Sequence, residues 1–546
     1  MSERWLRNTG FLLMALIVML LPAGMLRAAD STESGELPLY PMLADYGGAI
    51  REKTPRADGH RHIDTPATIR ELKRLHTDTY FFLIWDAKTD WDDLRREFLP
   101  AAQAEGIRVF AYLVPPSESK ARRSEPFGTD YVAWFREIGR LSRQYPNLKG
   151  MVIDDFTENL SHFTPDLMKK IRAAGKKENP KILFYAQVYH PSLTPAFIKT
   201  YAPLVDGLVM AFRDGRDRNT QRLDRLTEQI DQIRYQLEQS RLPLILMVYA
   251  SRLSATPASP SAEYVSGALV PALERLRLDR LQGVVTYVTE KRIQRKDAVG
   301  AVSGNAYASL FSPARGDARR DMVEWVQRVH VKKPSSGSLS FQVFQVSPSG
   351  APKGAHVLQL LVDGKTVWQQ DVSGLRPYAW HARTVHLGRH LQGKSQAVLS
   401  FRLVRTGKGT WCYTGIDDLR PEGFTVNNAD FELGDHGWTV VAGSRGMIGD
   451  VIYHDPNRSK RTFSVVSKYY AAFRIYKLTS ERTGPRLSAS ADTLLVRVLE
   501  GKHEESLNLL EKMIPLILFD KKLSIDEKQL LVRLCHDLHR RLEDER

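Results

Sequence analysis

Cysteine is nearly absent from this chain, with two residues among 546. Cys412 and Cys535 lie in segments that read as different domains, so we expect two isolated thiols instead of a disulfide framework. The sequence also has no group of cysteine and histidine residues at metal-ligand spacing. We therefore expect no metal site and no cofactor.

The motifs of several common enzyme and binding classes are also missing. There is no glycine-rich phosphate loop, no Ser/His/Asp order of a catalytic triad, and no zinc-finger, RNA-binding or helix-turn-helix signature. The net charge of +15 is spread over predicted helices such as Gln221–Arg241 and forms no basic tail. Solvated helix faces explain this spread, with attraction to an anionic polymer or a membrane surface as the alternative. Nucleic acid is not an expected partner.

No apolar run is long enough to cross a bilayer. The longest at the N-terminus, Phe11–Leu21, has 11 residues, follows Arg4 and Arg7, and precedes small residues near Ala28-Ala29. This pattern is typical of a signal peptide over residues 1–29, with an uncleaved anchor as the alternative. We therefore expect an exported protein, periplasmic or secreted, with no transmembrane span once the signal is removed.

Eight strand-like apolar runs recur through residues 38–330, most of them separated by an amphipathic helical pattern. Asp64-Thr65-Pro66 places a capping residue and a helix-start proline before one of these helices. Eight strands alternating with helices predict an α/β fold, a (β/α)8 TIM barrel, with a doubly wound open sheet as the competitor. The runs are Met42–Tyr46, Thr79–Trp85, Arg108–Val114, Gly150–Asp154, Ile182–Tyr189, Gly207–Phe212, Leu244–Tyr249 and Gly283–Val288.

The pattern changes near residue 333. Pro334–Ser338 reads as a linker or a turn, and the alternating segments beyond it show no helical period. They predict a β-sandwich over 336–470, in which Asp363-Gly364 forms a hairpin turn. Asn427–Trp438 resembles the opening of carbohydrate-binding β-sandwich modules, but too few strand-like runs follow for a separate module. We expect this segment to complete the sandwich.

The C-terminal residues 485–546 read as a small helical tail. Ser524-Ile-Asp-Glu527 matches a capping box, and Leu530, Leu531 and Leu534 recur at helical spacing after it. Such a tail offers a surface for a partner, so association with the cell envelope is one of the alternatives for this protein.

Carboxylates and aromatic rings gather where the predicted strands end. Barrel enzymes carry their chemistry at these carboxyl ends. Aromatic rings stack on sugar faces, and paired acids at such a rim are what cleavage of a glycosidic bond needs. Arg213 also follows a strand. The substrate-binding candidates are Asp45, Trp85, Asp86, Tyr112, Tyr185, Gln187, Tyr189, Asp214, Tyr249 and Tyr287.

The fourth strand leads directly into two neighbouring acids, Asp154 and Asp155, which are our first catalytic candidates. Val152–Phe156 resembles the fourth-strand motif of family 84 glycoside hydrolases, the N-acetylglucosaminidase group. The resemblance implies that the substrate's own acetamido group is the nucleophile, that Asp154 orients it, and that Asp155 is the general acid/base. Two carboxylates so close repel each other, which raises the pKa of one.

Several alternatives stay open. Strand alternation would point Asp154 and Asp155 to opposite faces, so only one of them would then act. A partner carboxylate would come from another strand, and Glu290, the third catalytic candidate, is best placed with Asp214, followed by Asp86. The rim tyrosines could instead fill the barrel interior.

The chemistry of the rim predicts an exported glycoside hydrolase-like enzyme that binds carbohydrate and uses acid/base catalysis without a metal. Two other classes of function remain. One is a catalytically silent barrel that binds carbohydrate, and the other is a structural or interaction protein of the envelope. The fold alone does not separate them.

Overall fold

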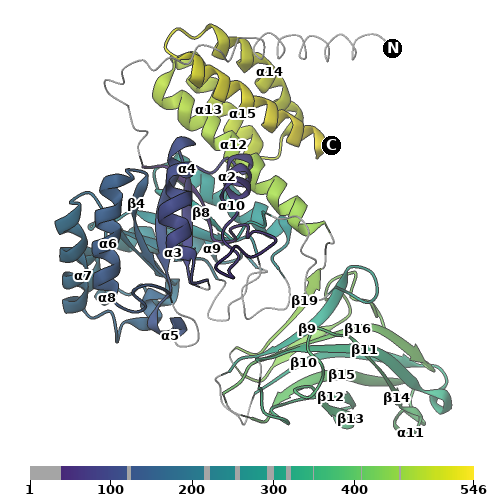
Figure 1. Ribbon diagram of the computed structural model, residues 1–546. Coiled ribbons are helices and arrows are strands. Elements are labelled where there is room, and N and C mark those ends of the chain that lie inside the picture. Colours follow the sequence, from purple (N-terminus) through teal and green to yellow (C-terminus); the bar gives the residue numbers. More distant parts are fainter. Residues whose placement is uncertain are drawn as a thin grey trace, which may run out of the picture. The chain divides into compact units, whose positions relative to one another are not determined.

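The computed structural model divides into two compact units, residues 43–467 and residues 1–42 with 468–546 (Figure 1). It describes residues 39–85, 87–119, 124–213, 222–251, 259–291, 300–314, 321–348, 350–407, 409–444, 446–453, 455 and 457–545. The predicted signal peptide, residues 1–29, lies outside the described residues.

Eight parallel strands form a closed barrel in chain order, each paired with the next. Their apolar side chains are almost all buried, as expected for strands covered on both faces. The (β/α)8 prediction is confirmed, and each strand boundary lies within two residues of the predicted one. The strands are β1 (Met42–Tyr46), β2 (Thr79–Ile84), β3 (Arg108–Leu113), β4 (Leu148–Ile153), β5 (Leu183–Val188), β6 (Gly207–Ala211), β7 (Leu244–Tyr249) and β8 (Gly283–Tyr287).

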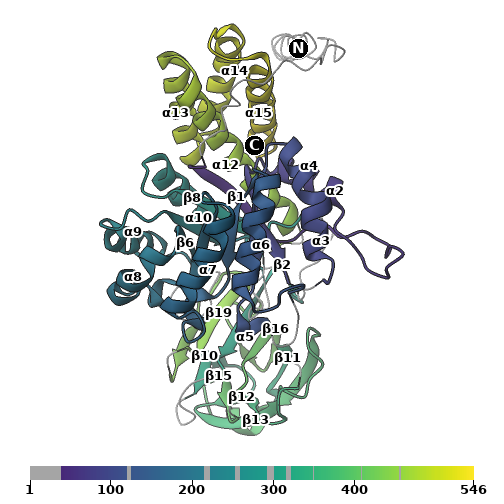
Figure 2. The ribbon, with the colours of Figure 1, turned by 60° about the vertical axis from the view of Figure 1, so that its left-hand side comes forward.

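Helices surround the strands of the barrel (Figure 2). The predicted cap of the first is confirmed, since the Asp64 side chain accepts a hydrogen bond from Ala67 N at 3.0 Å and Pro66 follows in the first turn. The helices are α2 (Thr65–Arg74), α3 (Asp90–Asp93), α4 (Leu99–Ala104), α5 (Pro116–Ser119), α6 (Tyr131–Gln144), α7 (Pro165–Glu178), α8 (Pro195–Tyr201), α9 (Leu226–Leu237) and α10 (Ala262–Arg277).

A buried ion pair joins the first barrel strand to the segment after the last. Asp45 on β1 pairs with Lys291, and both side chains are fully buried. Thr286 Oγ1 on β8 donates to Asp45 Oδ1 at 2.7 Å, and Thr289 N donates to the same oxygen at 3.0 Å. These contacts hold the two ends of the barrel sheet together.

The β-sandwich consists of two antiparallel sheets that enclose one apolar core. One sheet has the order β13-β12-β15-β10-β17, with β18 also paired to β10, and the other has the order β14-β11-β16-β9-β19. The strands are β9 (Ala306–Ser312), β10 (Met322–Val331), β11 (Ser338–Val346), β12 (His356–Val362), β13 (Lys365–Asp371), β14 (His381–His386), β15 (Gln396–Arg405), β16 (Cys412–Glu422), β17 (Phe424–Thr425), β18 (Thr439–Ala442) and β19 (Ile448–Tyr453).

The sandwich differs in extent from its predicted range, 336–470. Strand β9 and nearly all of β10 lie within the range that the sequence assigned to the barrel, because the boundary was predicted from the change of pattern near residue 333 and neither strand was identified. Asp363 and Gly364 have φ of 49° and 76° between β12 and β13, which confirms the predicted hairpin turn. The segment after Asn427 leads into β18 and β19, which pair with β10 and β9 and complete the sandwich.

Four helices follow the sandwich, where the sequence predicted only a small tail. The boundary between the two compact units falls inside α12 (Arg458–Arg482), and α13 (Pro485–Leu499), α14 (His503–Phe519) and α15 (Ile525–Asp544) follow side by side (Figures 1 and 2). The capping box at Ser524 and Glu527 is confirmed. Among the residues described here, no helix combines the length and apolarity that crossing a membrane requires.

Both cysteines are free, as predicted, and the structure shows that both are buried. Cys412 lies on β16 of the sandwich and Cys535 lies on α15. Burial raises the pKa of each thiol to about 12.

Candidate active site

The end of β4 turns sharply at the two neighbouring aspartates. Asp154 N still donates to Leu113 O at 2.9 Å, so the chain continues the ladder to β3 by one residue. Asp155 then adopts a left-handed backbone conformation with φ of 41°, which is uncommon for a residue other than glycine. Because the strand ends there, the alternation that would send the two side chains to opposite faces does not apply.

Asp154 is held from the side of β3. The Tyr112 hydroxyl donates to Asp154 Oδ1 at 2.8 Å, and Asp155 N donates to the same oxygen at 3.0 Å. Burial raises the pKa of the Asp154 carboxyl well above its ordinary value, and the charges of Asp155 and Glu118 raise it further. The two hydrogen bonds oppose this shift only in part, so Asp154 keeps its proton to a higher pH than an ordinary aspartate.

Asp155 is held from the side of β5. The Tyr189 hydroxyl donates to Asp155 Oδ1, and the Asp155 backbone N–H donates to Gln187 Oε1 at 2.7 Å. Asn159 Nδ2 donates to Asp155 O at 3.0 Å and stabilises the turn. The buried Gln187 amide therefore fixes the backbone of Asp155.

Five tyrosines form a continuous series around the two aspartates, here called the tyrosine arc. Neighbouring ring centroids are 4.4 Å apart for Tyr112 and Tyr46, 4.9 Å for Tyr46 and Tyr287, and 4.8 Å for Tyr287 and Tyr249. Tyr249 is hydrogen-bonded to Tyr189, which ends the series. The arc thus begins at the tyrosine that binds Asp154 and ends at the one that binds Asp155.

The arc consists of neutral phenols at ordinary pH. Burial raises the pKa of Tyr249 to about 12, and it raises the pKa of the other four as well. Four of the rings are buried, and Tyr287 is partly exposed. Neutral hydroxyls on apolar rings are suited to a sugar, which presents hydroxyls at its edges and C–H groups on its faces.

Two charged residues near the arc were not among the predicted site residues. Glu118 lies on α5, and Ser117 N of that helix donates to Asn159 Oδ1 at 3.3 Å, which ties α5 to the loop after β4. The charge of Glu118 raises the pKa of Asp154 and Tyr46. Glu118 lies five residues beyond the end of β3, so a search for site residues at the strand ends does not include it.

Arg213 is the second of these residues. It follows β6, and its guanidinium carbon lies 3.4 Å from the centre of the Tyr189 ring. The sequence placed Arg213 at the rim but gave no reason to choose it.

Asp45 and Glu290 have partners inside the protein. Asp45 pairs with the buried Lys291, as described above. Glu290 pairs with Arg458 Nη2 at 2.8 Å and accepts a hydrogen bond from Ser459 Oγ. Both oxygens of Glu290 are thus engaged with α12, and Glu290 has no contact with Asp154 or Asp155 in the described part of the chain.

The remaining predicted residues take different places. Tyr185 is fully buried, its ring 4.9 Å from that of Phe110, and it packs over Gly207, where any Cβ would meet the ring at 2.7 Å. It therefore fills the barrel interior. Trp85 is partly exposed at the end of β2. Asp86 and Asp214 lie outside the described residues.

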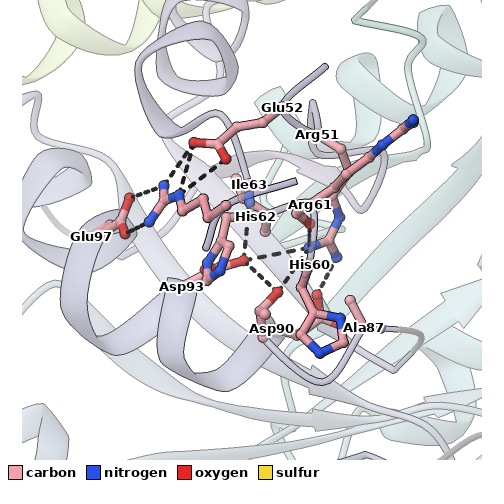
Figure 3. A network of polar contacts seen from close by, with 12 residues as sticks. Arg51, Glu52, His60, Arg61, His62, Ile63, Ala87, Asp90, Asp93 and Glu97 are labelled. Atoms are coloured by element: carbon pink, nitrogen blue, oxygen red, sulfur yellow. Dashed lines mark hydrogen bonds and ion pairs between the residues drawn. The ribbon is translucent and has the colours of Figure 1, made fainter. Parts of the chain in front are cut away.

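An ion-pair network anchors the loop after β1 (Figure 3). His62 Nδ1 lies 2.5 Å from Asp93 Oδ1, and His62 Nε2 lies 2.7 Å from Asp58 Oδ2. Burial lowers the pKa of His62, but the hydrogen bonds with the two aspartates outweigh it and the net shift is upward. Imidazolium is therefore favoured between the two carboxylates.

Part of this network has the donor types of a cation site. One ligand atom each from His62, Asp93 and Glu97 lies within 4.8 Å of the others. Arg56 Nη1, however, lies 2.5 Å from Glu97 Oε1, and Arg51 Nη1 lies 3.4 Å from Asp93 Oδ2. These guanidinium groups already neutralise the carboxylates, so the network is suited to fixing the loop.

Comparison with known proteins finds distant structural likenesses. No family model and no curated protein matches the chain. A calcium-binding mutant of Bacteroides uniformis beta-glucuronidase 2 aligns with 69% of this chain and 64% of its own, at 8% identity and a TM-score of 0.35. A glucosidase from Croceicoccus marinus aligns with 70% of this chain and 97% of its own, at 10% identity and a TM-score of 0.32. Pseudomonas stutzeri endoglucanase Cel5A aligns with 45% of this chain and 84% of its own, at 12% identity and a TM-score of 0.32. With TM-scores this low, the functional argument rests on the side chains of this chain.

Proposed function

We propose that this protein is an exported glycoside hydrolase that cleaves a glycosidic bond by acid/base catalysis at the end of β4. The observation that carries the proposal is the aspartate pair, Asp154 and Asp155, held by phenols from both sides. The pair provides a carboxyl of raised pKa beside a second carboxylate. A proton donor and a negative charge next to it are the two groups that glycosidic cleavage requires.

In the proposed reaction Asp154 is the acid and Asp155 stabilises the positive charge. The bond from the anomeric carbon to the leaving oxygen breaks, and that oxygen takes the proton of Asp154. Water then adds to the anomeric carbon and returns a proton to Asp154. Tyr189 holds Asp155 and Tyr112 holds Asp154 in place throughout, while Tyr287, the partly exposed member of the tyrosine arc, contacts the sugar.

The resemblance to family 84 implies the opposite roles, with Asp155 as the acid and Asp154 beside the acetamido group of an N-acetylated sugar. The raised pKa of Asp154 favours our assignment. Aryl glycosides separate the two, because a good leaving group needs little protonation. The variant that lacks the acid keeps most of its activity on such substrates, and the variant that lacks the other carboxylate loses activity on all of them.

The test is hydrolysis of a panel of glycans and aryl glycosides, N-acetylhexosaminides included, by the mature protein and by Asp154→Asn and Asp155→Asn. We expect each substitution to lower turnover of natural linkages by about 10²–10⁴-fold. The matched control is Asp166→Asn on α7, whose side chain is 85% exposed. Carbohydrate binding without turnover on any substrate would contradict the proposal and support the catalytically silent barrel.

Export is tested separately. The N-terminal segment predicts that the mature protein lacks residues 1–29 and collects in the periplasm or the medium. Cell fractionation and N-terminal sequencing measure both properties. Retention of the full chain in the cytoplasm would contradict this part of the proposal.

A further inference from the structure

Arg213 is half-buried, and none of the carboxylates that the structure describes forms an ion pair with it, in contrast to three other arginines of the barrel. Arg108, Arg172 and Arg458 pair with Asp78, Asp206 and Glu290 at 2.6, 3.0 and 2.8 Å. The Arg213 guanidinium contacts the Tyr189 ring, and within the described residues it has no ion pair or hydrogen bond. A partly desolvated guanidinium with five N–H donors is costly without acceptors.

The contact with Tyr189 fixes the orientation of this charge. At 3.4 Å from the ring centre, the guanidinium carbon lies over the ring face. A stacked guanidinium leaves the N–H groups at its edge available, and that edge matches two oxygens of a carboxylate, sulfate or phosphate. Stacking therefore prepares Arg213 to bind an oxyanion.

The place of Arg213 connects it with the proposed reaction. Tyr189 links Arg213 to the catalytic candidates, since the Arg213 guanidinium stacks on the Tyr189 ring and the Tyr189 hydroxyl donates to Asp155. A group bound at Arg213 is thus next to the sugar on which the aspartates act. The other charges near the arc, on Asp155 and Glu118, repel an anion, and Arg213 offsets them.

We propose that Arg213 binds an anionic group of the substrate, so that the site takes an acidic glycan, such as one with uronic acid carboxylates or sulfate esters. This inference rests on the proposed function for the position of the sugar. The net charge of +15 agrees with it, because a positive protein attracts a polyanion over long range.

Binding by a protein that cannot turn over tests this inference directly. Calorimetry with the Asp154→Asn full-length protein compares oligouronides with the same oligosaccharides after carboxyl reduction, and sulfated with desulfated oligosaccharides. We expect at least one acidic member of a pair to bind tighter, and Arg213→Gln to weaken that binding about 10- to 100-fold while changing neutral binding less than 2-fold.

Two further variants keep the result interpretable. Arg213→Lys retains the charge but not the planar edge, and we expect it to recover part of the affinity for the acidic member. Arg225→Gln, at a side chain 49% exposed, removes one positive charge elsewhere and is expected to leave binding within 2-fold. Thermal unfolding of each variant checks that it is folded.

The outcomes separate this inference from the proposed function. Acidic glycans that bind through Arg213 and are not cleaved would support the inference and contradict the hydrolase. Cleavage of neutral glycans by an Arg213→Gln protein as active as the parent would overturn the inference and leave the hydrolase intact. Equal affinity for the acidic and the neutral member of every pair would also overturn the inference.

Discussion

Tyr112 and Tyr189 reach the two aspartates from opposite sides of β4. The left-handed backbone of Asp155 makes this possible, because it ends the alternation of the strand between the two side chains. The adjacent acids were visible in the sequence, but the raised pKa of Asp154 was not. Burial raises it most, and the charges of Asp155 and of Glu118, which lies on α5, raise it further.

At the residue scale, Asp154→Asn is predicted to stabilise the folded protein at neutral pH. The folded-state pKa of Asp154 is raised, so the folded protein loses stability through this group as pH rises above about 4. Asparagine can accept the same two hydrogen bonds without the charge. We expect the variant to gain about 1–2 kcal/mol at pH 8 and little at pH 4.

Thermal unfolding of the variant and the parent across this pH range measures the gain. The control is Asp166→Asn, at an exposed side chain, which should give no difference that grows with pH. A gain for Asp154→Asn that stays constant or declines with rising pH would show that Asp154 is an ordinary carboxylate.

At the element scale, the barrel strands could be predicted because each is a short apolar run that carries its own signal. The sandwich strands were harder. β14 alternates exposed and half-buried residues around a single buried valine, so its apolar period is weak. β9 and β10 have strong local signals, but only their pairing with β15, β16 and β19 shows that they belong to the sandwich.

Long-range partners also explain why some site residues could not be judged from the sequence. Glu290 follows β8 at the carboxyl end of the barrel, where the sequence placed it, but its carboxylate is bound by Arg458, 168 residues later in the chain. Asp45 similarly finds Lys291 at a separation of 246 residues. No local pattern reports such pairs.

The buried pair that joins β1 to the end of β8 gives the prediction at this scale. Lys291→Met leaves Asp45 as a buried charge without its cation, and we expect a loss of about 3–5 kcal/mol in the free energy of unfolding. The double variant Asp45→Asn with Lys291→Met should recover part of the loss. Urea denaturation followed by circular dichroism measures both.

A solvated ion pair of the same barrel is the matched control. Lys169 and Asp166 on α7 are 66% and 85% exposed, so Lys169→Met should cost less than about 0.5 kcal/mol. Equal losses for Lys291→Met and Lys169→Met would mean that the buried pair contributes nothing specific to barrel closure.

For the whole molecule, each free cysteine reports on a different compact unit. Cys412 belongs to residues 43–467 and Cys535 to the unit that contains 468–546. Because both thiols are buried with a pKa of about 12, we expect no reaction with a thiol reagent at pH 8 in the native protein.

We expect the two compact units to unfold at different urea concentrations, so that denaturant exposes the two thiols in separate steps. Labelling along a urea series, with peptide mapping by mass spectrometry, assigns each step to its cysteine. Rapid labelling of either residue without urea, or a disulfide that reductant releases, would contradict the prediction.

The contact between Asp45 and Lys291 also bears on the order in which the chain is made. Asp45 is synthesised 246 residues before its partner. At about 5–20 residues per second, the ribosome needs on the order of 12–50 s to cover that distance. During this time the barrel sheet has an open edge, and the nascent chain carries a carboxylate that only the finished barrel can neutralise. A protein of this design depends on protection of its incomplete form while nearly half of its residues are being synthesised.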